Sequence, residues 1–173
     1  VQVHQTRYLI DIGFSDKVAA YALGLVGLCG IAGQIAIGHL SDRVGREWAW
    51  SFACLGFVAT YVCLLLLHEW PQHWLMYVMV GVQGFLGYGA ASVFGAVPAE
   101  LFAGKRYGLI FGVIASAAGA GAALGPWAMG LMFDHWGSYD QSFVVAIAVS
   151  VISILAMWLA GPRQVRLVAG RRG

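Results

Sequence analysis

Long apolar stretches separated by short polar turns make up most of the chain. Two of them, Val18 to Ile37 and Trp48 to Leu67, contain no charged residue and flank one dense charged turn, Gly38 to Glu47. A stretch of about 18 or more apolar residues is long enough to cross the hydrocarbon core of a bilayer as a helix. The pattern therefore predicts a membrane helical hairpin with residues 38–47 as its short hydrophilic turn.

Three further stretches have the same character, and together the five predict an all-α integral membrane protein. They run from Leu75 to Val97, from Tyr107 to Phe133 and from Phe143 to Gly161. Before the first span, Ser15 and Asp16 are residues that favour a turn and a helix N-cap. We therefore expect a mixed segment 1–17, a five-helix transmembrane bundle over residues 18–161, and a basic tail over residues 162–173.

Composition supports a membrane protein without a sizeable soluble domain. The 173 residues are 60% hydrophobic and 10% charged, with a mean hydropathy of +0.76, whereas soluble domains carry about 25% charged residues. The 24 glycines lie mainly inside the apolar stretches, which is typical of closely packed membrane helices. Glycines are concentrated in the first, third and fourth spans, so we expect these spans to be central and the second and fifth to be peripheral.

The placement of Lys and Arg predicts the orientation. Cytoplasmic loops carry an excess of these residues. Eight of them fall in the two charged turns and the tail, against two near the N-terminus, which places the N-terminus outside and the C-terminus in the cytoplasm. The eight are Arg43, Arg46, Lys105, Arg106, Arg163, Arg166, Arg171 and Arg172, and the two are Arg7 and Lys17.

The first charged turn carries a recognisable motif. Its letters GHLSDRVGR at positions 38–46 resemble the cytoplasmic signature loop of the major facilitator superfamily of secondary transporters. The resemblance implies a gating role for five residues of the turn: Gly38, Asp42, Arg43, Gly45 and Arg46. In the second charged turn, Glu100 and Arg106 are candidates for gating or for pairing between loops.

The resemblance also gives the spans a place in a larger fold. The five spans would correspond to helices 8–12 of the major facilitator fold, and residues 1–17 to the outer end of helix seven and its loop. The expected partners are the lipid bilayer, a small-molecule substrate and a missing N-terminal half of the same transporter. The implied activity is secondary active transport by alternating access, which this chain would not perform alone.

Two shorter stretches resemble the oxalate/formate antiporter and monocarboxylate transporter branch of that family. They are residues 4–13, and residues 99–102 followed by Arg106-Tyr107-Gly108. This favours a monocarboxylate or another organic anion as substrate. Transporters of that branch often carry an arginine one turn before the signature glycine, where this chain reads Gly33-Gln34. A carboxylate would therefore need a positive group from elsewhere.

Polar residues inside the spans are candidates for the wall of a substrate cavity. A buried amide or hydroxyl in hydrocarbon needs hydrogen-bond partners, which a substrate or a neighbouring helix can supply. Both interpretations stay open at this stage, and Gln83 is the strongest candidate. The set is Gln34, Gln83, Tyr88, Ser92 and Ser116.

The sequence shows no enzyme signature. It contains no Ser-His-Asp arrangement, no HExxH and no phosphate loop, so we expect no catalytic residues, no cofactor and no nucleic-acid partner. His68, Glu69 and His73 lie together in one turn, where interfacial residues are commoner than metal ligands, so no metal site is expected. The alternative to a transporter is a non-transporting membrane subunit or an inactive fragment.

Overall fold

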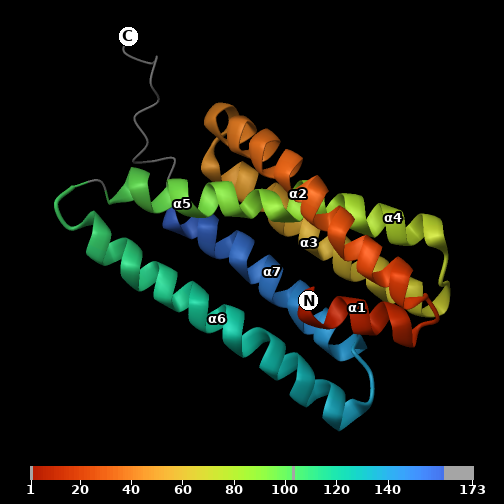
Figure 1. Cartoon of the computed structure of the whole chain (residues 1–173). Helices are drawn as coiled ribbons and strands as arrows, with labels where there is room; N and C mark the ends of the chain where they lie inside the picture. Colours follow the sequence, from red (N-terminus) through yellow and green to blue (C-terminus); the bar gives the residue numbers. More distant parts are fainter. Residues whose placement is uncertain (1, 103, 162–173) are drawn as a thin grey trace.

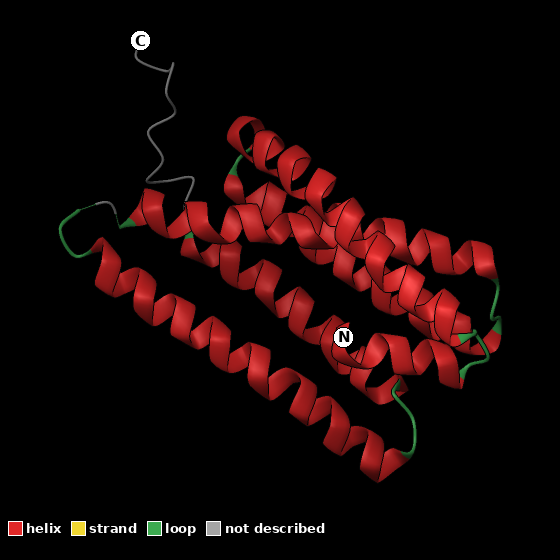
Figure 2. Ribbon diagram, in the orientation of Figure 1, coloured by secondary structure: helices red, strands yellow, loops and turns green. Residues whose placement is uncertain are grey.

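The computed structural model describes residues 2–102 and 104–161, and these residues form helices without any strand (Figure 2). The expected basic tail, residues 162–173, lies outside the described residues. Figure 1 shows a bundle of long helices joined by short turns. In chain order the helices are α1 (Gln2–Asp11), α2 (Asp16–Val44), α3 (Arg46–Glu69), α4 (His73–Gly81), η1 (Val82–Leu86), η2 (Gly87–Gly89), α5 (Ala90–Leu101), α6 (Tyr107–Trp136) and α7 (Asp140–Ala160).

Five helical stretches are long and apolar enough to cross a membrane, which confirms the all-α membrane architecture predicted from the sequence. They are Asp16–Val44, Arg46–Glu69, His73–Leu101, Tyr107–Trp136 and Asp140–Ala160. The predicted N-cap of the first is present, because the Ser15 hydroxyl accepts a hydrogen bond from the Val18 amide at 3.4 Å.

The third stretch is not one regular helix. It begins as α4, passes through the π-helix η1 and the short 3₁₀-helix η2, and continues as α5. The predicted span over residues 75–97 is therefore confirmed in extent, but its hydrogen-bonding pattern changes in the middle. Pro98 lies in the last turn of α5, which ends at Leu101. The helix tolerates this proline because only one backbone donor is lost there.

Glycines let α2 and η1 approach closely. A side-chain carbon at Gly33 would overlap the backbone of Phe85, and one at Gly84 would lie 2.7 Å from the Val26 carbonyl oxygen. Only a residue without a side chain fits such an approach. The expected close packing of the first and third spans is thus present.

Within the described residues, the second span is more enclosed than expected and the fourth is less enclosed. α3 is the most buried of the five stretches and α6 the least. Bulky α3 side chains such as Leu64 and Leu67 fill the core, so large residues there are buried rather than peripheral. On α6, a side-chain carbon at Gly112, Gly119 or Gly125 would meet no described atom within 4 Å. Glycine content alone does not decide which helix is enclosed.

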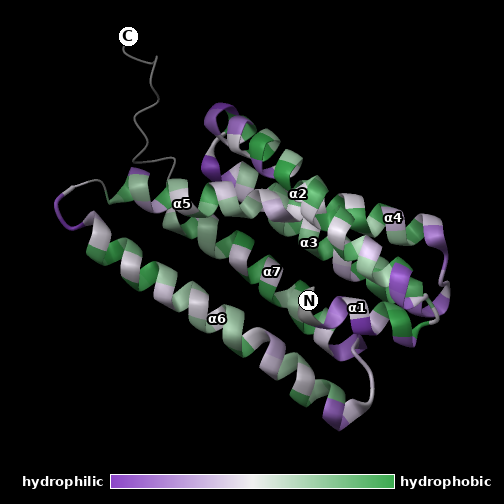
Figure 3. Ribbon diagram, in the orientation of Figure 1, coloured by the Kyte–Doolittle hydropathy of each residue, from purple (hydrophilic) through white to green (hydrophobic). Residues whose placement is uncertain are grey.

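The polar residues gather at the two ends of the bundle (Figure 3). One end, called here the signature end, holds the α2–α3 turn, the C-terminus of α5 and the N-terminus of α6. The opposite end holds α1, the α3–α4 turn and the α6–α7 turn. Both predicted charged turns therefore lie at the same end of the helices.

Candidate functional site

The signature turn is a tight reversal between α2 and α3. The only residue between the two helices is Gly45, whose φ is +112° and whose amide donates to the Ser41 carbonyl at 3.1 Å. A positive φ of this kind is readily adopted only by glycine. The other glycine of the turn, Gly38, lies about two helical turns earlier on α2 and faces Ser92 of α5.

Arg46 is the centre of an ionic network at the signature end. Its Nε and Nη2 atoms donate to one carboxylate oxygen of Glu100 at 2.9 and 2.7 Å. Nη2 also lies 2.8 Å from Oδ1 of Asp42, and Nη1 donates to the hydroxyl of Ser41. The Arg46 side chain is only 12% exposed and that of Glu100 25%, so these charge-assisted bonds are shielded from water. The network joins the start of α3 to the end of α2 and the last turn of α5.

Arg43 and Arg106, the other two charged candidates, take no part in the ion pairs that Arg46 forms with Asp42 and Glu100. Arg43 and Arg106 are exposed at the same end. Glu47 occupies the first turn of α3 and is 2% exposed. The pairing of Glu100 with another loop was among the sequence alternatives, but its partner across 54 residues of chain could not be identified from spacing.

The candidate cavity residues fall into two groups. Gln83 and Tyr88 line an open cavity of about 500 Å³ between α3, η1, η2, α6 and α7. The Gln34 and Ser116 side chains are exposed on α2 and α6. Ser92 joins α5 to α2, because its hydroxyl lies 2.8 Å from the Gln34 carbonyl oxygen and 3.1 Å from that of Gly89. For Ser92 the interpretation as an interhelical hydrogen bond is therefore the better one.

Sequence reasoning missed the partner of Gln83. Its Nε2 donates to the Oε1 of Gln5 at 2.9 Å, and Gln5 belongs to α1, outside the predicted spans. Both glutamines are 1% exposed. The only signal in the sequence was the amide of Gln5 itself, which lies in a segment of mixed polarity. Such a residue does not indicate a partner 78 positions away.

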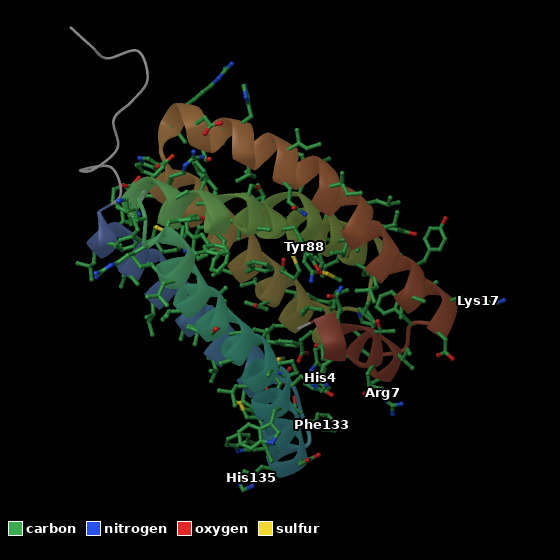
Figure 4. The ribbon with its side chains drawn as sticks, turned by 60° about the vertical axis from the view of Figure 1, so that its left-hand side comes forward. His4, Arg7, Lys17, Tyr88, Phe133 and His135 are labelled. Carbon is green, nitrogen blue, oxygen red and sulfur yellow. The ribbon has the colours of Figure 1, made fainter. Side chains whose placement is uncertain are left out.

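At the opposite end, His4 connects α1 to the other helices. Its Nε2 lies 3.1 Å from the Pro126 carbonyl oxygen of α6, and its Nδ1 lies 3.2 Å from the Tyr139 hydroxyl. Figure 4 shows His4 on α1 at this end, on the same side as Phe133 and well away from Lys17. Burial, followed by the negative charge of Asp11, raises the pKa of Tyr139 above its ordinary value of 10.0. No group of three potential metal ligands occurs among residues 2–102 and 104–161.

Taken together, five helices long and apolar enough to cross a membrane and a charged turn at one end define a polytopic membrane protein. The sequence profile of the Major Facilitator Superfamily matches residues 6–172. The chain therefore belongs to the Major Facilitator Superfamily.

Three relatives illustrate the similarity. The chain is 30% identical to a multidrug transporter MdfA of Edwardsiella ictaluri (strain 93-146), over 100% of this chain and 39% of that protein. It is 28% identical to monocarboxylate transporter 13 of Rattus norvegicus, over 83% of this chain and 33% of that protein. It is also 28% identical to a multidrug resistance protein MdtG of Klebsiella pneumoniae (strain 342), over 70% of this chain and 29% of that protein. The chain thus spans between 29% and 39% of the length of these relatives.

Proposed function

We propose that this chain is part of a secondary transporter that moves a small organic solute across a membrane by alternating access. Membership of a transporter family and similarity to proteins named as transporters support this function. The five spans would then be helices 8–12 of the family fold, and the rest of the relatives' length would supply the other bundle. In alternating access, two such bundles rock around a site between them.

The observation that carries the proposal is the Asp42–Arg46–Glu100 network at the signature end. Arg46 is held inside this half, so it is not the group that reaches across to the other half. Asp42 has a side chain that is 60% exposed while it contacts Arg46. A carboxylate in that position suits a helix N-terminus of the opposing bundle. Asp42 would therefore latch the transporter closed at this end, and Arg46 and Glu100 would hold it in place.

The complete protein with Asp42→Asn tests the latch. We expect slower transport and a population shifted toward opening at the signature end, with insertion unchanged. Spin-label distances across that end and solute uptake into vesicles measure both effects. Asp11→Asn is the matched control, because Asp11 forms an ion pair with Arg7 at 2.9 Å at the opposite end. Unchanged uptake and unchanged distances in Asp42→Asn would reject the latch.

The positive-inside distribution supports a cytoplasmic signature end and an N-terminus outside. A membrane-impermeant maleimide tests this orientation in intact cells, after the three native cysteines are replaced. Lys17→Cys should be labelled and Arg106→Cys should be protected until the cells are opened. The opposite labelling pattern would reverse the assignment.

The alternative is a membrane subunit or inactive fragment that does not transport. Vesicles that contain the complete protein, or this chain alone, distinguish the two. We expect uptake only with the complete protein, and no uptake from either would favour the alternative.

The three relatives differ in the substrates that their names give. One is named a monocarboxylate transporter, and two are named for multidrug transport or resistance. The branch resemblance favours a monocarboxylate or another organic anion. An anion of this kind requires a cationic partner in or near its site, and the interior of the five spans offers no charged side chain in the sequence.

A further inference from the structure

The cavity between α3, η1, η2, α6 and α7 has the composition of a small-molecule site. Its volume is about 500 Å³, and its wall is formed mainly by aromatic rings and small or flexible apolar residues. Binding sites for small molecules are typically apolar clefts with a few polar groups that fix orientation. In this cavity the convergent polar side chains include the Gln83 amide and the Tyr88 hydroxyl.

Gln83 presents an unpaired acceptor. Its side chain is 1% exposed, and its Oε1 has no hydrogen-bond partner among the described residues. Its Nε2 is already used, because it donates to Gln5 at 2.9 Å. An amide oxygen buried without a partner carries an energetic cost. A ligand that donates a hydrogen bond would remove that cost.

Met79 fixes which end of the Gln83 amide is unpaired. The Gln5 Nε2 donates to the Met79 sulfur at 3.5 Å, and a thioether can only accept. Reversing the Gln5 amide would place its oxygen against that sulfur, where no donor is available. Gln5 therefore directs its oxygen toward Gln83, and Gln83 must donate to it. The same chain of bonds leaves the Gln83 oxygen as the open atom.

Tyr88 adds a second group in the same segment. Its hydroxyl is buried without a partner among the described residues, and its ring lies against Gly30 of α2. Figure 4 shows Tyr88 between α2 and α6, on the inner side of the bundle. A hydroxyl can both accept and donate, so it can bind the same donor as Gln83 or a neighbouring polar atom of the ligand.

The backbone that carries Gln83 and Tyr88 departs from the regular α-helix, as is common at binding sites. Gln83 lies in the π-helix η1 and Tyr88 in the 3₁₀-helix η2, in the middle of a membrane span. Single turns of π-helix are frequent at functional sites. At membrane depth, departures from the regular helix are tolerated where they are enclosed by protein or line a cavity.

The described wall of the cavity offers no positive charge to a negatively charged ligand. Every described residue that lines the cavity is uncharged, and the open polar atom of Gln83 is an acceptor. A carboxylate would lose its hydration and face another oxygen, which is strongly unfavourable in an apolar environment. Aromatic side chains such as Phe57 and Tyr61 offer ring faces to an apolar ligand instead.

Resting on the proposed transport function, we propose that Gln83 and Tyr88 are specificity-determining residues for the solute. The solute has an apolar, ring-sized body, an O–H or N–H donor and no negative charge. The donor binds the Gln83 oxygen, and the body fills the cavity between α3 and α6. This assignment opposes the organic-anion substrate that the sequence resemblance favours.

Three naphthalenes of similar size test the assignment: naphthol with a donor, methoxynaphthalene without one, and naphthoate with a negative charge. Equilibrium dialysis against the purified complete protein measures binding of each. We expect naphthol to bind at least about fivefold more tightly than methoxynaphthalene, the equivalent of one hydrogen bond, and naphthoate to bind most weakly. Tightest binding of naphthoate, or equal binding of the first two, would overturn the assignment.

Substitutions assign the effect to the two residues. Gln83→Leu should abolish the preference for naphthol over methoxynaphthalene while leaving methoxynaphthalene binding within about twofold, because only the acceptor is lost. Tyr88→Phe keeps the ring and should reduce the preference in part. Gln141→Leu and Tyr77→Phe are controls at exposed positions. If Gln83→Leu fails to fold, Tyr88→Phe still decides the question. A preference that persists in both variants identifies the two groups as helix-packing residues.

Failure of this inference is distinguishable from failure of transport. Dialysis reports binding alone, and the latch and uptake experiments report movement. A protein that takes up solute but shows no Gln83-dependent preference overturns the site and keeps the transport function. A protein that shows the preference but moves no solute keeps the site and argues against transport.

Discussion

Arg46 and Glu100 form the shortest link between the two charged turns of the sequence, with Nη2 of the arginine 2.7 Å from Oε1 of the glutamate. The two residues are 54 positions apart and belong to α3 and α5. Both side chains are largely shielded, so neutralising Glu100 removes a charge-assisted contact and leaves the more exposed Asp42 as the carboxylate beside Arg46.

Glu100→Gln should therefore destabilise the signature end of the complete protein. We expect the free energy of unfolding to fall by roughly 1–3 kcal/mol, as for partly buried ion pairs that lose one member. Thermal melting in detergent measures the effect. The double variant Arg46→Gln/Glu100→Gln should lose less than the sum of the single variants, whereas additive losses would show that the two residues do not interact.

The contact between Gly33 and Phe85 predicts a second effect. Gly33→Ala should lower stability by roughly 1–3 kcal/mol, the usual cost of overpacking, because the new carbon would meet fixed backbone rather than a movable side chain. Gly24→Ala in the same helix is the control. A carbon there meets nothing within 4 Å, so it should be neutral or slightly stabilising. Melting temperatures that do not differ would contradict the close approach of α2 and η1.

Two reciprocal hydrogen bonds hold α3 against α7. Trp50 donates to Ser153 and Trp158 donates to Ser51, each at 3.0 Å. Ser51→Ala and Ser153→Ala should each cost roughly 0.5–1.5 kcal/mol, and their effects should add because the bonds are separate. Ser150→Ala is the control, since its hydroxyl bonds within α7 to the Ala146 carbonyl. Losses no larger than those of the control would count against the two bonds.

Much of the fold could be predicted from the sequence because lipid imposes simple rules. Uniformly apolar stretches fix the five spans, since every backbone group in hydrocarbon must be bonded within the helix. The cap at Ser15 follows from local chemistry and is confirmed.

The site depends on contacts that the sequence does not encode locally. The glycines at 81, 84, 87 and 89 make the third span permissive, but they do not determine that it becomes a π-helix and then a 3₁₀-helix. Gln83 could be recognised as a buried amide, whereas its partner Gln5 comes from a segment with no apolar span. The burial of α3 reflects which helices surround it, so its bulky residues could equally have faced lipid.

The opposite end provides a prediction about pH, through Tyr139. This side chain is 6% exposed, and burial followed by Asp11 raises its pKa above 10.0. In the unfolded chain the phenol ionises near its ordinary value of about 10. Above that pH the unfolded chain releases this proton before the folded protein does, so the free energy of unfolding falls as the pH rises. Below that pH the group contributes no pH dependence.

Tyr139→Phe should therefore flatten the loss of stability in alkaline solution. Unfolding free energies of the complete protein and the variant, measured on both sides of about pH 10, give the contribution of Tyr139 as the difference between the two curves. The variant also loses the hydrogen bond to His4. This loss lowers the free energy of unfolding by the same amount at every pH below the ordinary pKa of tyrosine. A constant difference that persists unchanged into alkaline solution would mean that Tyr139 ionises equally in the folded and unfolded states. A difference that narrows above about pH 10 is the result that its burial between α1, α6 and α7 requires.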